Sequence, residues 1–166
     1  MMRSKLFLMI FLIPLCLFAQ GNDQVFVPFL IDLDGYQAEK AEGISLKMGD
    51  MENITASREY EGSSENFLTV MIMKTNQATL FQPMIDETID YSGPDGMFQT
   101  TTIDGFKTYI TQEEGLNDGA VMILLDQSET GGTFVSFSYE NGSLDEIKKI
   151  IGKFNLKAIH AKAKSL

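Results

Sequence analysis

The chain has 166 residues, of which 13 are Lys or Arg and 23 are Asp or Glu, so its formal net charge at pH 7 is −10. So acidic a protein repels nucleic acid and anionic lipid, because both are bound through Lys and Arg side chains that neutralise phosphate. The composition therefore excludes nucleic acid as an expected partner.

The first nineteen residues have the pattern of an export signal. Arg3 and Lys5 precede an unbroken apolar run, Leu6–Phe18, and Ala19 follows it. A basic start, a short apolar stretch and a small residue at its end are typical of a cleaved signal peptide. The run is too short to cross the hydrocarbon layer as a helix, which needs about 20 residues. We predict a signal peptide over 1–19 and export to the periplasm or the medium, with no stable membrane insertion after cleavage.

Cys16, the single cysteine, lies inside this apolar run. An alternative interpretation makes it the lipidated residue of a lipoprotein signal, but such signals carry small residues where this chain has Pro14 and Leu15. Cleavage after Ala19 leaves 20–166 as a single soluble domain without a disulfide, a thiolate metal site or a thiol nucleophile. Because the leader holds two basic residues and no acidic one, the mature net charge is −12.

The first half of the mature chain predicts an N-terminal segment and three strands. Pro28 interrupts the apolar segment Val25–Leu33, which indicates an extended or one-turn piece pressed onto the fold. Strands are then predicted at 44–48, 54–60 and 67–73, with tight turns between them. Both alternating sets of side chains in 67–73 are apolar, so this strand is expected to be covered on both faces and central in the sheet.

A helix is predicted from Thr79 to about Asp90. Apolar residues recur there at helical spacing, namely Leu80, Phe81, Met84, Ile85 and Ile89. Thr79 can cap the start, which places Pro83 near the first turn, where a missing N–H costs least.

Four more strands are predicted at 98–103, 106–111, 120–125 and 133–139. Asp104-Gly105 stands between two of them and is a strong hairpin signal; Gly131-Gly132 separates the last two. The strand 120–125 is again apolar on both faces.

The C-terminal region predicts the second helix. Ser143 and Glu146 form a capping box, and Ile147, Ile150, Ile151 and Phe154 follow on one face. Asn155 interrupts this helix, so we expect at most one further turn at 156–160 and a frayed tail from about 161. The whole pattern predicts an α+β fold with a single antiparallel sheet of about seven strands, in βββαββββα order, and two helices packed on it.

No catalytic, cofactor-binding or metal-binding residue is predicted. A Ser–His scheme would rest on His160, the only histidine, which we expect at the surface of the tail. The sequence has no G-x-S-x-G, no H-E-x-x-H and no Gly-rich phosphate loop. Asp32, Asp34 and Gly35 resemble the start of a calcium loop, but the twelfth position, which needs a bidentate Glu, is Gly43.

Methionine is the one unusual feature of the composition. Outside the leader it occurs at Met48, Met51, Met71, Met73, Met84, Met97 and Met122. Thioethers can hold cuprous ion, and Met48-x-x-Met51 facing Met71-x-Met73 could supply the ligands. The favoured interpretation is core packing, where methionine fills irregular space.

Segments spread over nearly all of the mature chain carry a resemblance to known proteins. They are Asp34-Gly-Tyr-Gln-Ala-Glu39, Glu42-Gly43 with Met48-Gly49, Thr55-Ala-Ser-Arg-Glu-Tyr60, Thr102-Ile-Asp-Gly-Phe106 and the amphipathic C-terminal helix. Together they resemble a group of small exported bacterial proteins of unknown function, and being turn and core features they imply nothing about activity. The element order loosely resembles that of the Mog1/PsbP-type domain, which implies binding and assembly rather than catalysis, without any residue assignment.

Three functional hypotheses follow. The first is an exported, non-enzymatic domain without a cofactor that binds a protein partner or a small ligand through a sheet face or the loop-rich end. The second is a methionine-based periplasmic protein that handles cuprous ion or another metal. The third is an enzyme whose site consists of carboxylates alone.

Overall fold

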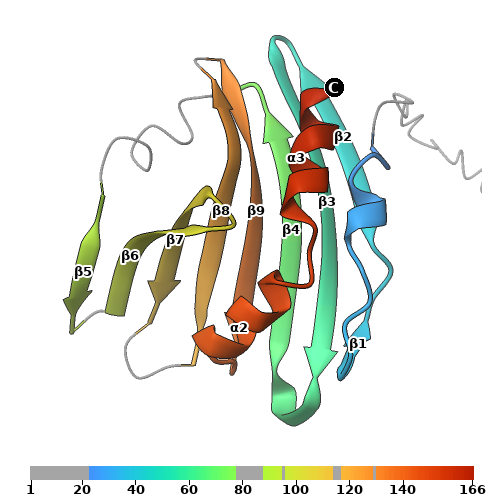
Figure 1. The fold of residues 1–166 in the computed structure, drawn as a ribbon. Helices are drawn as coiled ribbons and strands as arrows, with labels where there is room; N and C mark the ends of the chain where they lie inside the picture. Colours follow the sequence, from blue (N-terminus) through green and yellow to red (C-terminus); the bar gives the residue numbers. More distant parts are fainter. Residues whose placement is uncertain (1–22, 78–87, 95, 114–116, 129) are drawn as a thin grey trace, which may run out of the picture.

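The computed structural model describes residues 23–77, 88–94, 96–113, 117–128 and 130–166, which form one antiparallel sheet with two helices on one face (Figure 1). The α+β prediction is confirmed. The expected signal peptide, 1–19, lies outside the described residues.

The sheet contains nine strands in the part of the chain that the structure describes. They are β1 (Tyr36–Ala38), β2 (Glu42–Met48), β3 (Met51–Gly62), β4 (Phe67–Thr75), β5 (Asp90–Gly93), β6 (Gly96–Ile103), β7 (Phe106–Gln112), β8 (Gly119–Ser128) and β9 (Gly131–Glu140). Their spatial order is β1-β3-β4-β9-β8-β7-β6-β5. Strand β2 also pairs with β3, along the same edge of β3 that β1 uses. All seven predicted strands are present. The two that sequence reasoning missed, β1 and β5, are too short for alternation to reveal them.

The two strands predicted to be central are central. β4 lies between β3 and β9, and β8 lies between β9 and β7. The hairpin at Asp104-Gly105 is also confirmed, since both residues have positive φ, +53° and +87°, as a type I′ turn requires. Gly131 and Gly132 lie inside β9 instead of separating two strands. A Cβ on Gly131 would meet the Thr75 carbonyl oxygen, so the close approach of β4, and not a turn, accounts for this glycine.

The first C-terminal helix, α2 (Leu144–Ile151), begins as predicted. The Ser143 hydroxyl accepts a hydrogen bond from the Glu146 N–H at 3.2 Å. The Glu146 carboxylate, however, accepts from the Tyr36 hydroxyl at 2.9 Å. The second half of the expected capping box is thus replaced by a hydrogen bond that joins α2 to β1.

The second helix, α3 (Leu156–Lys164), is longer than predicted. Asn155 starts it by accepting from the Ala158 N–H at 3.0 Å, and Leu156, Ile159 and Ala163 are buried. The Lys74 ammonium donates to the Ala163 carbonyl at 2.7 Å, which satisfies a group at the helix end. The predicted fraying from about residue 161 is therefore wrong, because tertiary contacts hold this last turn.

The predicted helix at 79–90 falls mostly on 78–87, which lie outside the described residues. Its described end is not helical, because Asp90 begins β5 and pairs with Gln99. Both described helices accordingly come from the C-terminal region.

The core lies between one face of the sheet, the helices and the N-terminal segment. Apolar side chains from five neighbouring strands point into it, and Phe137 of β9 contacts Phe154 edge-to-face, with ring centroids 5.1 Å apart. The prediction for Val25–Leu33 is confirmed, since it contains one 3₁₀ turn, η1 (Val27–Phe29), and buries Phe26 and Leu30.

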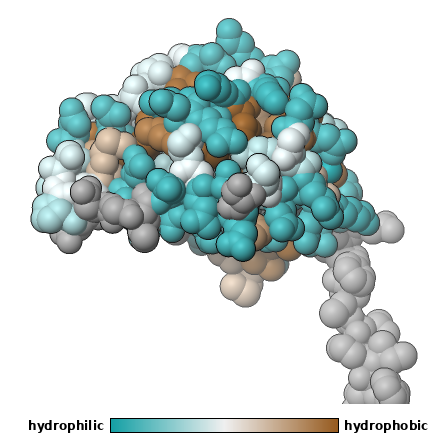
Figure 2. All heavy atoms as spheres, turned by 90° about the horizontal axis from the view of Figure 1, so that it is seen from below, coloured by the Kyte–Doolittle hydropathy of each residue, from teal (hydrophilic) through white to brown (hydrophobic). Residues whose placement is uncertain are grey.

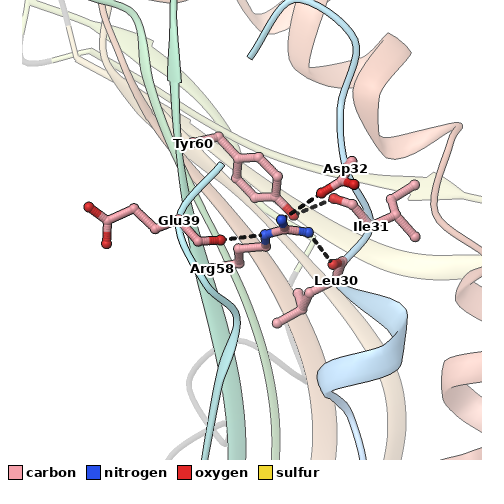
Figure 3. A network of polar contacts seen from close by, with 6 residues as sticks. All are labelled: Leu30, Ile31, Asp32, Glu39, Arg58 and Tyr60. Atoms are coloured by element: carbon pink, nitrogen blue, oxygen red, sulfur yellow. Dashed lines mark hydrogen bonds and ion pairs between the residues drawn. The ribbon is translucent and has the colours of Figure 1, made fainter. Parts of the chain in front are cut away.

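Arg58 of β3 fastens this N-terminal segment to the sheet (Figure 3). Its guanidinium donates to the Leu30 carbonyl at 2.7 Å, the Glu39 carbonyl at 2.8 Å and the Asp32 carboxylate at 2.6 Å. The neighbouring Tyr60 hydroxyl donates to the Ile31 carbonyl at 2.9 Å. Burial raises the pKa of Tyr60, although the Arg58 charge lowers it in part. These bonds satisfy backbone oxygens of a segment that has few ladder bonds of its own.

Candidate functional site

The face of the sheet opposite α2 and α3, here called the open face, carries a hollow. One row of directly paired residues crosses six strands on this face, here called the floor row: Thr69, Ser138, Ala120, Thr111, Phe98 and Tyr91. Every member lines a cavity of about 590 Å³. This volume lies within the range of small-molecule sites, about 300–1,000 Å³.

Side-chain size explains where this open-face cavity lies. The middle of the floor row consists of Ser138, Ala120 and Thr111, which are short, whereas Phe98 and Tyr91 stand at one end. Two residues along the strands, the next row contains three long side chains, Met71, Met122 and Tyr109, together with Ser136 and Thr100. Short side chains between longer ones leave a depression in a twisted but continuous sheet.

Three carboxylates lie at the end of the open-face cavity. Glu140 ends β9, Asp118 precedes β8 and Glu113 follows β7, so they come from three neighbouring strands at the same sheet end. The Glu113 N–H donates to the Asp118 carbonyl at 3.1 Å, and Asp118 Oδ1 accepts from the Asn141 N–H at 2.9 Å. Neither Lys, Arg nor His occurs among the described residues that line the cavity.

Figure 2 views the molecule from this end of the sheet. Hydrophilic residues cover most of the surface there, and apolar residues emerge between them and at the lower margin of the view. The end of the sheet that carries the three carboxylates is thus mostly hydrophilic at its surface.

Tyr139, which belongs to the core on the helix-covered face together with Phe137, has a polar group without a partner. The residue is 2% exposed, and among the described residues nothing forms a hydrogen bond with its hydroxyl. That hydroxyl lies 2.6 Å from where a Cβ on Gly119 would be. Burial raises the pKa of Tyr139, and the negative charge of Asp118 raises it further.

His160 is not the surface residue that the sequence predicted. It lies within α3, its ring contacts Phe106 edge-to-face with centroids 5.4 Å apart, and its Nε2 is buried with no hydrogen-bond partner in the described part of the chain. It does not line the open-face cavity. The structure brings no Ser–His pair together there.

The acidic pair that resembled a calcium loop takes part in ion pairs. Asp32 contacts Arg58 at 2.6 Å, and Asp34 contacts Lys153 at 3.7 Å. Within the described ranges, no three His, Cys, Asp or Glu side chains lie close enough to hold a metal ion. The three carboxylates of the cavity likewise form no such group.

The two methionine pairs do not face each other as suggested. Met48 pairs with Met51 across the β2–β3 turn, whereas Met73 lies opposite Thr55. Met51 and Thr55 are four residues apart, about 13 Å along a strand. Met71 and Met122 were expected in the core, but they lie half-buried on the open face; Met97 packs against the core, and Met84 lies outside the described residues.

A second apolar feature lies at the sheet edge. β2 pairs only with β3 in the described part of the chain, and Ile44, Leu46 and Met48 are 63%, 46% and 66% exposed. Their pairing partners place them on the open face.

Comparisons with known proteins found no match: no family model, no curated protein and no solved structure is similar to this chain. The resemblance to small exported proteins and to the Mog1/PsbP-type domain stays a prediction. Among the described residues no helix is long and apolar enough to cross a membrane.

Sequence reasoning missed the floor row. Its signal in the sequence was a short side chain on each of three separate strands, namely Thr111, Ala120 and Ser138. Only the register shows that Ser138, Ala120 and Thr111 are neighbours.

Proposed function

We propose that this protein is an exported, non-enzymatic binding module that holds a small organic ligand in the open-face cavity, in the periplasm or the medium. The observation that supports this best is the floor row, whose short central residues leave about 590 Å³ between aromatic and acidic margins. A concave site with apolar walls and a few polar groups is the usual form of a ligand site.

Binding is favoured over carboxylate catalysis by the surroundings of the acids. Acid–base pairs of carboxylates need one group in apolar surroundings, so that its pKa rises toward the working pH. Glu113 and Glu140 are exposed, and Asp118 is engaged by the Asn141 N–H. These three acids are suited to attracting a ligand, and none is desolvated as a general acid would be.

A fragment screen tests the proposal. A few hundred water-soluble fragments of mixed charge would be added to the ¹⁵N-labelled mature protein, and amide shifts would be followed. We expect hits that shift the amides of Thr69, Ala120 and Ser138. Ala120→Leu should fill the floor and abolish these shifts.

The matched control is Ala158→Leu, the same change at a half-buried position of α3, on the other face of the sheet. It should leave the shifts unchanged. A screen without hits in the cavity, or hits that persist in Ala120→Leu, would contradict the proposal.

A second candidate is a protein partner that contacts β2. The observation that favours it is the row of exposed apolar side chains at an unpaired strand edge, a common site of protein contact. Leu46→Lys should then abolish partner capture from the native host without changing ligand binding in the cavity, whereas Thr102→Lys, at another exposed position of the open face, should leave capture intact.

A further inference from the structure

We propose that the ligand of the open-face cavity is an organic ammonium ion, held between the Tyr91–Phe98 ring pair and the Glu113 and Asp118 carboxylates. This inference rests on the proposed function, and it names the chemical class of the ligand.

The two rings and Glu113 come from three adjacent strands, and Asp118 comes from the strand beyond them. Tyr91 of β5 and Phe98 of β6 are direct cross-strand partners on the open face, and β7, which Glu113 follows, is the next strand. Phe98 pairs with Thr111, two residues before Glu113. Since neighbouring strands are about 4.8 Å apart, one small ligand can contact the rings and the carboxylate together.

Charge selects a cation. The cavity is lined by three carboxylates and, among the described residues, by no basic side chain. Like charges on neighbouring strands destabilise each other, and a cation in the cavity relieves that repulsion. The net charge of −10 adds a long-range attraction for cations at low salt.

Ring chemistry selects an organic cation over a metal ion. The face of an aromatic ring attracts an ammonium group within about 6 Å, and most strongly where water is excluded. Tyr91 is 49% exposed, so its ring is open to a ligand. A metal ion would instead need several ligands close together, and within the described ranges no three His, Cys, Asp or Glu side chains form such a group.

The test compares two probes of the same shape. Choline carries a quaternary ammonium and a hydroxyl, and 3,3-dimethylbutan-1-ol has carbon in place of the nitrogen. Each is titrated into the mature protein at low ionic strength while the amides of Ala120 and Ser138 are followed. We expect choline to bind at least about tenfold more tightly.

Three variants locate the ammonium. Glu113→Gln and Tyr91→Leu should each weaken choline binding about threefold or more. Glu42→Gln removes the same charge from an exposed position on β2, on the same face but far from the cavity, and it should change the affinity less than about 1.5-fold.

The outcomes separate the two proposals. If the neutral alcohol binds as tightly as choline, or if Glu113→Gln and Glu42→Gln have equal effects, the ammonium inference is wrong and the proposed function stands. If choline does not shift these amides at all, the inference is likewise overturned, and the mixed-charge screen judges the proposed function. If Ala120→Leu leaves choline binding intact, the cation binds outside the cavity, so the ammonium inference is wrong, and the mixed-charge screen judges the proposed function.

Discussion

The two faces of the sheet are built from the same strands, yet the helix-covered face is packed throughout, whereas the open face is hollowed at one end. On the helix-covered face, Val70, Phe137 and Val121 are directly paired neighbours and all are fully buried. On the open face the next residues along those strands, Thr69, Ser138 and Ala120, are paired in the same way and line a cavity. The comparison teaches that strand alternation decides which residues share a face, whereas side-chain size along a paired row decides whether that face closes.

The largest expected effect comes from a matched pair of ring deletions. Phe137→Ala should lower the free energy of unfolding by about 3–5 kcal/mol, because it removes a fully buried ring that packs on Phe154. Phe98→Ala, on the open face, should cost about 1 kcal/mol, because that ring is half-exposed. Urea denaturation of both variants measures the difference. Equal losses would mean that the open face is packed as tightly as the core.

The next effect concerns the attachment of the N-terminal segment to the covered face. Arg58→Met should cost about 2–3 kcal/mol, since it leaves the Leu30 and Glu39 carbonyls without their donor. The Asp32 contribution is small, because that carboxylate is 90% exposed. Limited proteolysis should cut the segment faster in the variant. Arg58→Lys is expected to restore only part of the lost stability, because one ammonium group cannot reproduce the three hydrogen bonds of the planar guanidinium.

A smaller effect depends on pH. Burial, followed by the hydrogen bond to Glu146 and the charge of that carboxylate, raises the pKa of Tyr36 from 10.0 to about 12. A raised pKa stabilises the fold fully below pH 10, and this contribution disappears as the pH rises from 10 toward 12.

Tyr36→Phe isolates this contribution. The variant should be about 1 kcal/mol less stable than the wild type at pH 7, because the bond to Glu146 is missing. The difference should shrink steadily above pH 10, as seen by urea denaturation at several pH values. A difference that stays constant to pH 12 would show that the Tyr36 proton does not link to folding.

The smallest expected effect concerns the methionines of the open face. Because Met48 and Met71 are far apart in the register, cuprous ion should not stabilise the protein through them. The double variant Met48→Leu, Met71→Leu should show the same melting temperature shift with saturating Cu(I) as the wild type, within about 1 °C. A shift that is lost in the variant would revive a thioether site.

Much of the fold could be predicted from local patterns. The turn at Asp104-Gly105 needs two residues that tolerate positive φ, and the Asp-Gly dipeptide alone indicates such a turn. The start of α2 follows from Ser143 in the same way. The helix α3 could not be foreseen in full, because its last turn depends on Lys74, which is 89 residues away from Ala163 along the chain.

The candidate site could not be predicted from the same patterns. Glu113, Asp118 and Glu140 are read from the sequence as separate loop acids, and Tyr91 lies in a strand too short to recognise. Their proximity follows from the pairing of five strands, which no single stretch of sequence contains.

The fold class, seven of the strands, the central places of β4 and β8 and the start of α2 could all be predicted from the chain alone, because each leaves a pattern of residue types within a short stretch. The tertiary structure alone decided the register, and with it the floor row, the three neighbouring carboxylates, the Arg58 contacts and the bond from Tyr36 to Glu146. The cavity exists because several short side chains lie next to one another on the sheet. These side chains come from different strands, so they become neighbours only when the strands pair in this register.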